Sequence, residues 1–243
     1  MIDEQPPVTP PAPPPERVPF WGYADVALML GLSLPCIFVG VGFVRLLAWL
    51  GHFHLAVGVE SVLAFLVGYA LIFLSLKVIF RVQYDRPFWS SLGWTEKGVS
   101  AFQCVIYGCA TLFLVSGVAR LVHAPPAEGP ITEMMKDHTS LIVMAIFGTT
   151  VAPVAEELAF RGFVQPLLVR NLGAIGGVAL TSAFFGGLHY SEYGESWRSA
   201  LLIAVAGAAF GSMRQLTGST LASAIMHASF NGLQFAALLI SPK

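Results

Sequence analysis

Charged residues are scarce in this chain of 243 residues, where they make up 11% of the sequence, against about 25% in a typical soluble domain. Hydrophobic residues make up 56%, and the mean hydropathy is +0.72. So few charges cannot cover a water-facing surface, which excludes a soluble globular protein and indicates a polytopic membrane protein. Long basic runs are also missing, so nothing in the sequence points to nucleic acid as a partner.

Cysteine is rare as well, and its pattern excludes a metal-binding or redox motif. Cys36, Cys104 and Cys109 have no CxxC spacing and stand in apolar stretches, so we expect them to be small buried hydrophobic residues. The N-terminus lacks the apolar segment of a signal peptide and is acidic, then rich in proline. We expect a proline-rich disordered tail at residues 1–19 and a single transmembrane helical domain at 20–243.

Long apolar stretches dominate the rest of the chain. A spanning helix needs about 20 residues, and seven stretches are candidates: 24–47, 55–80, 99–122, 140–169, 174–190, 198–213 and 219–240. The sequence therefore predicts an all-α fold, a polytopic transmembrane helix bundle of about seven spans, in the cell (inner) membrane. The distribution of Lys and Arg favours a cytoplasmic N-terminus by seven residues to five, a margin that leaves the topology open.

Ionisable side chains deep in a span are costly and usually functional, and the fourth apolar stretch carries three of them. Glu157 and Arg161 are four residues apart and share a helix face, so they can pair. Glu156 points about 100° away and is left as the free carboxylate. We expect Glu157 and Arg161 to hold the site together while Glu156 reacts, although a purely structural ion pair would leave the same pattern.

Two further apolar stretches bring polar side chains to a similar depth. Counted at 1.5 Å per residue from the turns on one side, the depths are about 21 Å for Glu156, about 22 Å for His189, about 21 Å for Asn231 and about 15 Å for His227. Taken alone, a histidine at the end of a span, such as His189, is more often an interfacial residue. Convergence of three helices at one level predicts a polar cavity within the membrane.

Hydrolysis is the chemistry that this set favours. A carboxylate and a neutral imidazole around a water molecule can activate it, and a second histidine and an asparagine offer N–H donors to an oxyanion. No serine or cysteine is an evident nucleophile, so a water activated by Glu156 is the simplest reagent. Two histidines with a carboxylate could hold Zn²⁺, but no HExxH motif occurs and Arg161 would repel a cation. We therefore expect no metal and no other cofactor.

The same residues resemble the motifs of the CPBP family, the intramembrane glutamic proteases that include CAAX proteases and bacteriocin-processing enzymes (Abi family). That family carries EExxxR, FxxxH and HxxxN or HxxxD on successive core helices. The corresponding segments here are EELAFR (156–161), FGGLH (185–189) and HASFN (227–231). Together they cover the second half of the chain, so the resemblance implies a family-like catalytic core at about 140–240, and no motif position departs from the pattern.

The resemblance implies a helical membrane bundle that hydrolyses a peptide bond of a membrane-associated protein or peptide. Glu156 and His189 would activate the water, His227 and Asn231 would form the oxyanion hole, and Glu157 and Arg161 would orient the site. It leaves open whether the substrate is prenylated and which membrane face the site opens to. The competing hypothesis is a non-proteolytic membrane protein, either an immunity or scaffold protein or a small transporter, although we find no repeated halves of the kind that transporters show.

Overall fold

The computed structural model describes residues 18–126 and 128–240, and within these ranges the secondary structure is helical, with no strand. The predicted all-α fold is therefore confirmed. The helices are α1 (Tyr23–Leu50), α2 (Val57–Gln83), α3 (Phe88–Ser91), α4 (Ala101–Leu121), α5 (Pro130–Met134), α6 (His138–Glu157), the π-helix η1 (Leu158–Val164), α7 (Gln165–Leu188), α8 (Trp197–Thr217) and α9 (Thr220–Ile240).

Six helical stretches of the described residues are long and apolar enough to cross a membrane. One of them, His138–Leu188, has 51 residues and would be about 76 Å long if straight, more than twice the thickness of a bilayer core. It is not straight, because Gly173 has the non-helical angles φ 72° and ψ 173°. The chain turns back there, since the Phe160 ring lies 5.0 Å from that of Phe185. The stretch therefore makes two passes, in agreement with about seven spans.

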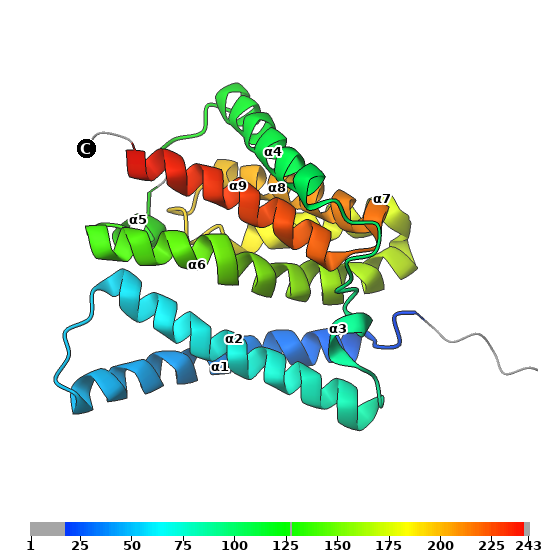
Figure 1. The fold of residues 1–243 in the computed structure, drawn as a ribbon, viewed down its shortest axis with the longest axis horizontal. Coiled ribbons are helices and arrows are strands. Elements are labelled where there is room, and N and C mark those ends of the chain that lie inside the picture. The colour runs from blue at the N-terminus through cyan, green and yellow to red at the C-terminus, as the bar shows by residue number, and fades with distance from the viewer. Residues whose placement is uncertain (1–17, 127, 241–243) are drawn as a thin grey trace, which may run out of the picture.

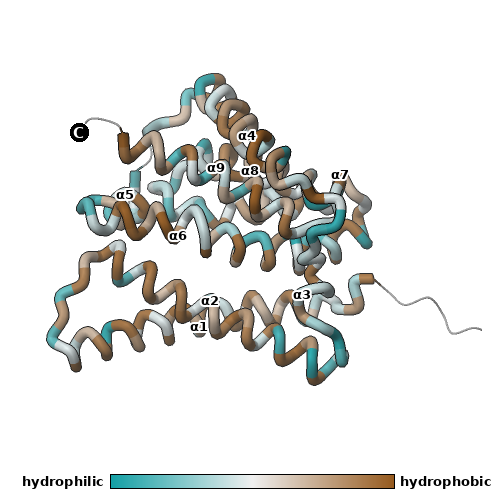
Figure 2. Tube along the Cα trace, viewed as in Figure 1, coloured by the Kyte–Doolittle hydropathy of each residue, from teal (hydrophilic) through white to brown (hydrophobic). Residues whose placement is uncertain are grey.

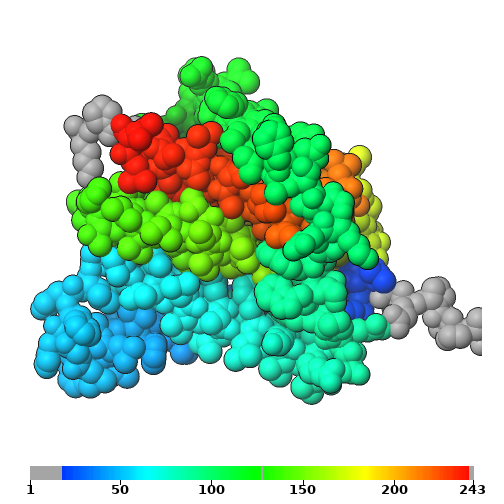
Figure 3. Space-filling model, in the orientation of Figure 1, coloured from blue at the N-terminus to red at the C-terminus, as the bar shows by residue number. Residues whose placement is uncertain are grey.

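The helices form two groups with α6 between them (Figure 1). The α1–α2 hairpin lies along one side of α6, and the contact between them is made through α2. On the other side α9 packs on α6 and α4 packs on α9, while α7 and α8 pack on each other. Figure 3 shows the hairpin as a distinct layer beside α6. As a result, the end of α6, η1 and the middle of α9 lie inside the molecule.

The outward faces of these helices are apolar along most of their length (Figure 2). Large hydrophobic side chains on α1 are among the most exposed, including Leu34, Phe38 and Trp49. Charged and polar residues gather at helix ends, for example Arg81 and Asp85, which form an exposed ion pair at the end of α2. An apolar exterior of this kind is expected where lipid replaces water as the solvent.

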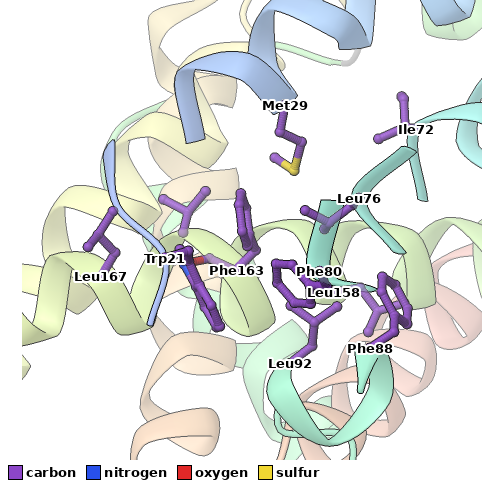
Figure 4. Close-up of a cluster of buried hydrophobic side chains, with 11 residues drawn as sticks. Trp21, Met29, Ile72, Leu76, Phe80, Phe88, Leu92, Leu158, Phe163 and Leu167 are labelled. Carbon is purple, nitrogen blue, oxygen red and sulfur yellow. The ribbon is translucent and has the colours of Figure 1, made fainter. Parts of the chain in front are cut away.

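An aromatic core beside the π-helix ties the N-terminal segment to the second half of the chain (Figure 4). The Trp21 indole is stacked with the rings of Phe80 and Phe163, at centroid distances of 5.3 and 5.2 Å. Its Nε1–H donates to the Phe163 carbonyl at 3.0 Å. The predicted tail lies outside the described residues apart from 18 and 19, and Pro19 accepts a hydrogen bond from Arg170. The start of the chain thus supports the helix that carries the acidic motif.

Close helix packing brings α8 against α7 and η1. A Cβ added to Gly186 of α7 would overlap the Ala200 carbonyl of α8, so only glycine permits this approach. At Gly207 of α8 an added Cβ would lie 3.1 Å from Nη2 of Arg161. Small residues therefore let the α8 backbone reach the polar groups of η1.

Candidate active site

The six residues of the three motifs lie on the inner helices. Glu156 and Glu157 end α6, Arg161 is in η1, His189 directly follows α7, and the last two, His227 and Asn231, are on α9. The π-helix begins one residue after the two carboxylates. Such π-helical segments are rare in proteins, but those that occur are often found at functional sites.

Glu157 is the buried centre of this cluster, with a side chain that is 0% exposed. Its Oε1 accepts from Nη1 of Arg161 at 3.0 Å and from Nδ1 of His227 at 2.9 Å. Its Oε2 accepts from the Ser223 hydroxyl at 2.6 Å. The ion pair with Arg161 that the four-residue spacing predicted is confirmed. Three donors from two helical segments, η1 and α9, hold this carboxylate in one orientation.

Arg161 is equally buried and has further partners besides Glu157. Its Nη2 donates to the Gly207 carbonyl at 2.8 Å, and its guanidinium carbon lies 4.6 Å from the centre of the Phe185 ring. Planar guanidinium groups are suited to such combined pairing and stacking. Arg161 therefore neutralises the buried carboxylate and links η1 to α7 and α8.

His227 connects the two neighbouring carboxylates. Because Glu157 is ionised beside Arg161 and can only accept, the proton on Nδ1 of His227 is assigned to that hydrogen bond. The other ring nitrogen, Nε2, lies 3.8 Å from Oε2 of Glu156. The ring is stacked on Phe210 at 4.4 Å. Glu157 and Phe210 thus fix the imidazole so that Nε2 faces Glu156.

Glu156 differs from its neighbour in exposure, with a side chain that is 21% exposed. A groove of about 400 Å³ between α2 and α6 includes Ala155, the residue before it, and Tyr69 and Lys77 of α2. The rest of the groove is mostly apolar. Glu156 is therefore the carboxylate that a water molecule or a ligand can reach.

Asn231 lies one helical turn beyond His227 and is half-buried. Its Nδ2 donates one hydrogen bond, of 2.8 Å, to the Gly148 carbonyl of α6. A side-chain amide has a second N–H on the same nitrogen. The bond to α6 orients the amide and leaves this second donor for another acceptor.

His189 stands apart from the other five predicted residues. Its Nδ1 lies 2.8 Å from the Phe185 carbonyl, to which it donates, and its Nε2 lies 3.7 Å from Oε2 of Glu192. Within the described ranges, no hydrogen bond or ion pair joins it directly to Glu156. The two are nevertheless close to a common residue, because the charges of both act on Glu192.

Two residues of the site were not predicted from the sequence. One is Ser223, which lies in the cluster although the sequence offered no serine as an evident nucleophile. It is fully buried and its hydroxyl is held between Glu157 and the Phe210 carbonyl, so it supports the site and is not an accessible nucleophile. Its position four residues before His227 was the available signal. The other is Glu192, for which the only signal in the sequence was its position three residues after His189 in a polar connection.

In the described part of the chain, no three His, Cys, Asp or Glu side chains are grouped so that they could hold a metal ion. The nearest charged neighbour of the carboxylates is the guanidinium of Arg161, as the sequence suggested. What the cluster offers chemically is a reachable carboxylate, two oriented imidazoles and a side-chain amide.

One comparison with known proteins is informative. Residues 138–233 match the family model described as "Type II CAAX prenyl endopeptidase Rce1-like". No curated protein and no solved structure matches the chain. The matched range begins with α6 and ends in α9, so it contains all six residues of the three motifs.

Proposed function

We propose that this chain is an intramembrane endopeptidase that hydrolyses a peptide bond in a membrane-associated protein or peptide. The match of residues 138–233 to the Rce1-like family model supports a CAAX-type membrane endopeptidase in general. The finer assignment rests above all on one observation, the reachable Glu156 beside a buried, oriented pair of Glu157 and His227.

Glu156 is the general base of the proposed reaction. A carboxylate that is partly exposed can bind water, and it can take a proton as the water oxygen attacks the peptide carbonyl carbon. His189 is the second group that exchanges protons with the reacting molecules. Its Nδ1 is engaged by the Phe185 carbonyl, so Nε2 is the nitrogen available for this task.

His227 and Asn231 stabilise the oxyanion that forms on the carbonyl oxygen. The His227 ring is held by its Nδ1 bond to Glu157 at 2.9 Å and by stacking on Phe210, and in the proposed step it donates from Nε2 when the ring carries both protons. Asn231 contributes the N–H that does not bind Gly148. A donor aimed at such an oxyanion typically contributes about 10²–10³-fold in rate.

Glu157 and Arg161 act through His227 and do not touch the reacting atoms. We also propose that catalysis needs no metal, because the guanidinium of Arg161 supplies the positive charge that balances the carboxylates. The residues N-terminal to α6 complete a single transmembrane domain in the cell (inner) membrane. The substrate is a membrane-associated protein or peptide that enters beside Glu156, with the apolar groove as its approach.

The test is a comparison of new peptide termini in cells that lack the protein and are complemented with wild type or with Glu156→Gln. Glutamine keeps the shape of the side chain but cannot act as a base, so cleavage should fall by about 10²–10⁴-fold. Glu195→Gln is the matched control, because Glu195 is an exposed glutamate in the connection between α7 and α8.

Termini that are present with wild type and Glu195→Gln but absent with Glu156→Gln would identify substrates and establish proteolysis. If the profiles of wild type and Glu156→Gln are the same while both restore the phenotype, the protease assignment is wrong. An immunity or scaffold protein, or a small transporter, would then take its place.

A further inference from the structure

A third carboxylate, that of Glu192, lies at the site but belongs to none of the three motifs. It is in the connection between α7 and α8, and its side chain is 36% exposed. Its Oε2 is 3.7 Å from Nε2 of His189, and the charge of Glu156 acts on it as well. Glu192 is therefore the carboxylate that lies beside His189, within the influence of the charge of Glu156.

The backbone holds Glu192 in this place. Its carbonyl accepts from the Ile131 N–H of α5 at 3.2 Å, and the Glu195 N–H closes the connection onto the Tyr190 carbonyl at 3.0 Å. Gly129 and Gly194 pack backbone to backbone, where an added Cβ on Gly129 would lie 2.5 Å from the Gly194 nitrogen. The carboxylate is thus presented by an anchored turn and not by a free loop.

The protonation of His189 follows from its two neighbours. The Phe185 carbonyl can only accept a hydrogen bond, so Nδ1 of His189 carries the proton and donates it to that carbonyl. In a neutral ring, Nε2 then has a lone pair, and this lone pair faces Glu192. An ionised carboxylate facing that lone pair would be repelled. One shared proton, on either Nε2 or the carboxyl group, removes the repulsion.

The surroundings of Glu192 favour retention of that proton. Burial raises the pKa of its carboxyl, the charge of Glu156 acts in the same direction, and His189 acts in the opposite one. The other titratable groups that face it are Tyr69 from α2 and Tyr193 beside it in the connection. Glu128, in the segment before α5, lies near the same connection, since a Cβ added to Gly194 would be 3.3 Å from its carbonyl oxygen.

We propose that Glu192 is a positioning residue that shares one proton with His189, and that this proton goes to the amine that leaves in the cleavage step. The proposal rests on the proposed function and deepens it. The 3.7 Å separation exceeds an ordinary hydrogen bond, so Nε2 of His189 is not saturated and can turn to the substrate nitrogen.

The proton balance closes with these groups alone. Glu156 takes one proton from water as the water oxygen bonds to the carbonyl carbon and the carbonyl oxygen becomes an oxyanion. The carbon–nitrogen bond then breaks, and the amide nitrogen keeps its electron pair and receives the proton held by His189 and Glu192. The products are a carboxylic acid and an amine, and the proton on Glu156 returns to the pair.

The test is an NMR titration of the full chain in lipid nanodiscs with isotope-labelled histidine, using His189→Gln to assign the His189 signal. Glu192→Gln removes a negative charge 3.7 Å from the ring, so the pH midpoint of the His189 signal should fall by about 1–3 pH units. Glu195→Gln in the same connection should leave it unchanged. Glu192→Asp keeps the negative charge, so the pH midpoint of its His189 signal should stay close to that of wild type. This second variant keeps the test decisive if Glu192→Gln does not fold.

A second readout uses the substrate identified in the termini experiment. A proton donor is lost as the pH rises, so Glu192→Gln should move the alkaline limb of kcat to lower pH by the same amount, with little change in KM. An unchanged midpoint, or an unchanged alkaline limb with only a lower yield of folded protein, would overturn the proposal. Failure of the proposed function would be seen separately, as absence of cleavage by wild type.

Discussion

Replacement of Arg161 by methionine tests whether the buried ion pair holds the site together. Methionine keeps much of the volume but removes three interactions of the guanidinium. These are the 3.0 Å bond to Glu157, the 2.8 Å bond to the Gly207 carbonyl and the 4.6 Å contact with the Phe185 ring. We expect a large loss of folding free energy, because the first of them leaves a carboxylate buried without its counter-charge.

The size of the loss follows from burial. Both side chains of the pair are 0% exposed, and removal of one partner from a buried pair typically destabilises by about 3–5 kcal/mol. His227 and Ser223 still donate to Glu157, which keeps the expected value within that range. The double variant Glu157→Gln/Arg161→Met carries no unpaired charge, so it should be less destabilised than Arg161→Met alone.

The assay is equilibrium unfolding of the full chain in mixed micelles, followed by tryptophan fluorescence. Arg81→Met is the matched control, since Arg81 pairs with Asp85 at the same four-residue spacing but the two side chains are 76% and 82% exposed. It should change the unfolding free energy by less than about 1 kcal/mol. The reasoning fails if the two methionine variants unfold alike, or if the double variant is less stable than Arg161→Met.

Two further predictions concern the packing that supports the site. Gly186→Ala should destabilise the protein by about 1–3 kcal/mol, because the new methyl group would overlap the backbone of α8. Gly187→Ala is the control and should not destabilise it, because a Cβ added there would meet no neighbouring heavy atom within 4 Å. Trp21→Phe should lower the unfolding free energy by about 1–2 kcal/mol through loss of the bond to the Phe163 carbonyl, whereas Trp89→Phe, at a 53% exposed site, should change it by less than about 0.5 kcal/mol. The same unfolding assay measures both, and equal effects within either pair would contradict the packing argument.

Local periodicity accounts for what could be predicted from the sequence. The number of apolar stretches and the pairing of Glu157 with Arg161 depend on residues that are close along the chain, and both agree with the structure. Counting helix depth predicted that Glu156, His189, His227 and Asn231 converge. The structure brings Glu156 to 3.8 Å from His227, whereas within the described residues no hydrogen bond or ion pair joins Glu156 to His189. The catalytic roles assigned to these residues stay predictions.

Long-range packing accounts for what could not be predicted. The π-helix at 158–164 depends on contacts with the N-terminal segment and α8, neither of which is encoded in its own sequence. The bond between His227 and Glu157 joins residues 70 positions apart. Glu192 was missed because a glutamate in a polar connection looks solvated, and only the anchoring of that connection to α5 brings it to His189.

The adjacency of two carboxylates, unusual in an apolar helix, is explained by the different directions in which consecutive residues point. Glu157 faces α9 and is fully buried, and there it fixes the ring of His227. Glu156 points elsewhere and remains 21% exposed. A single carboxylate could not do both, because the three donors that hold Glu157 would leave it unable to accept a proton from water. The neighbouring pair thus separates support from reaction within one turn of helix, with His227 as the physical connection between them.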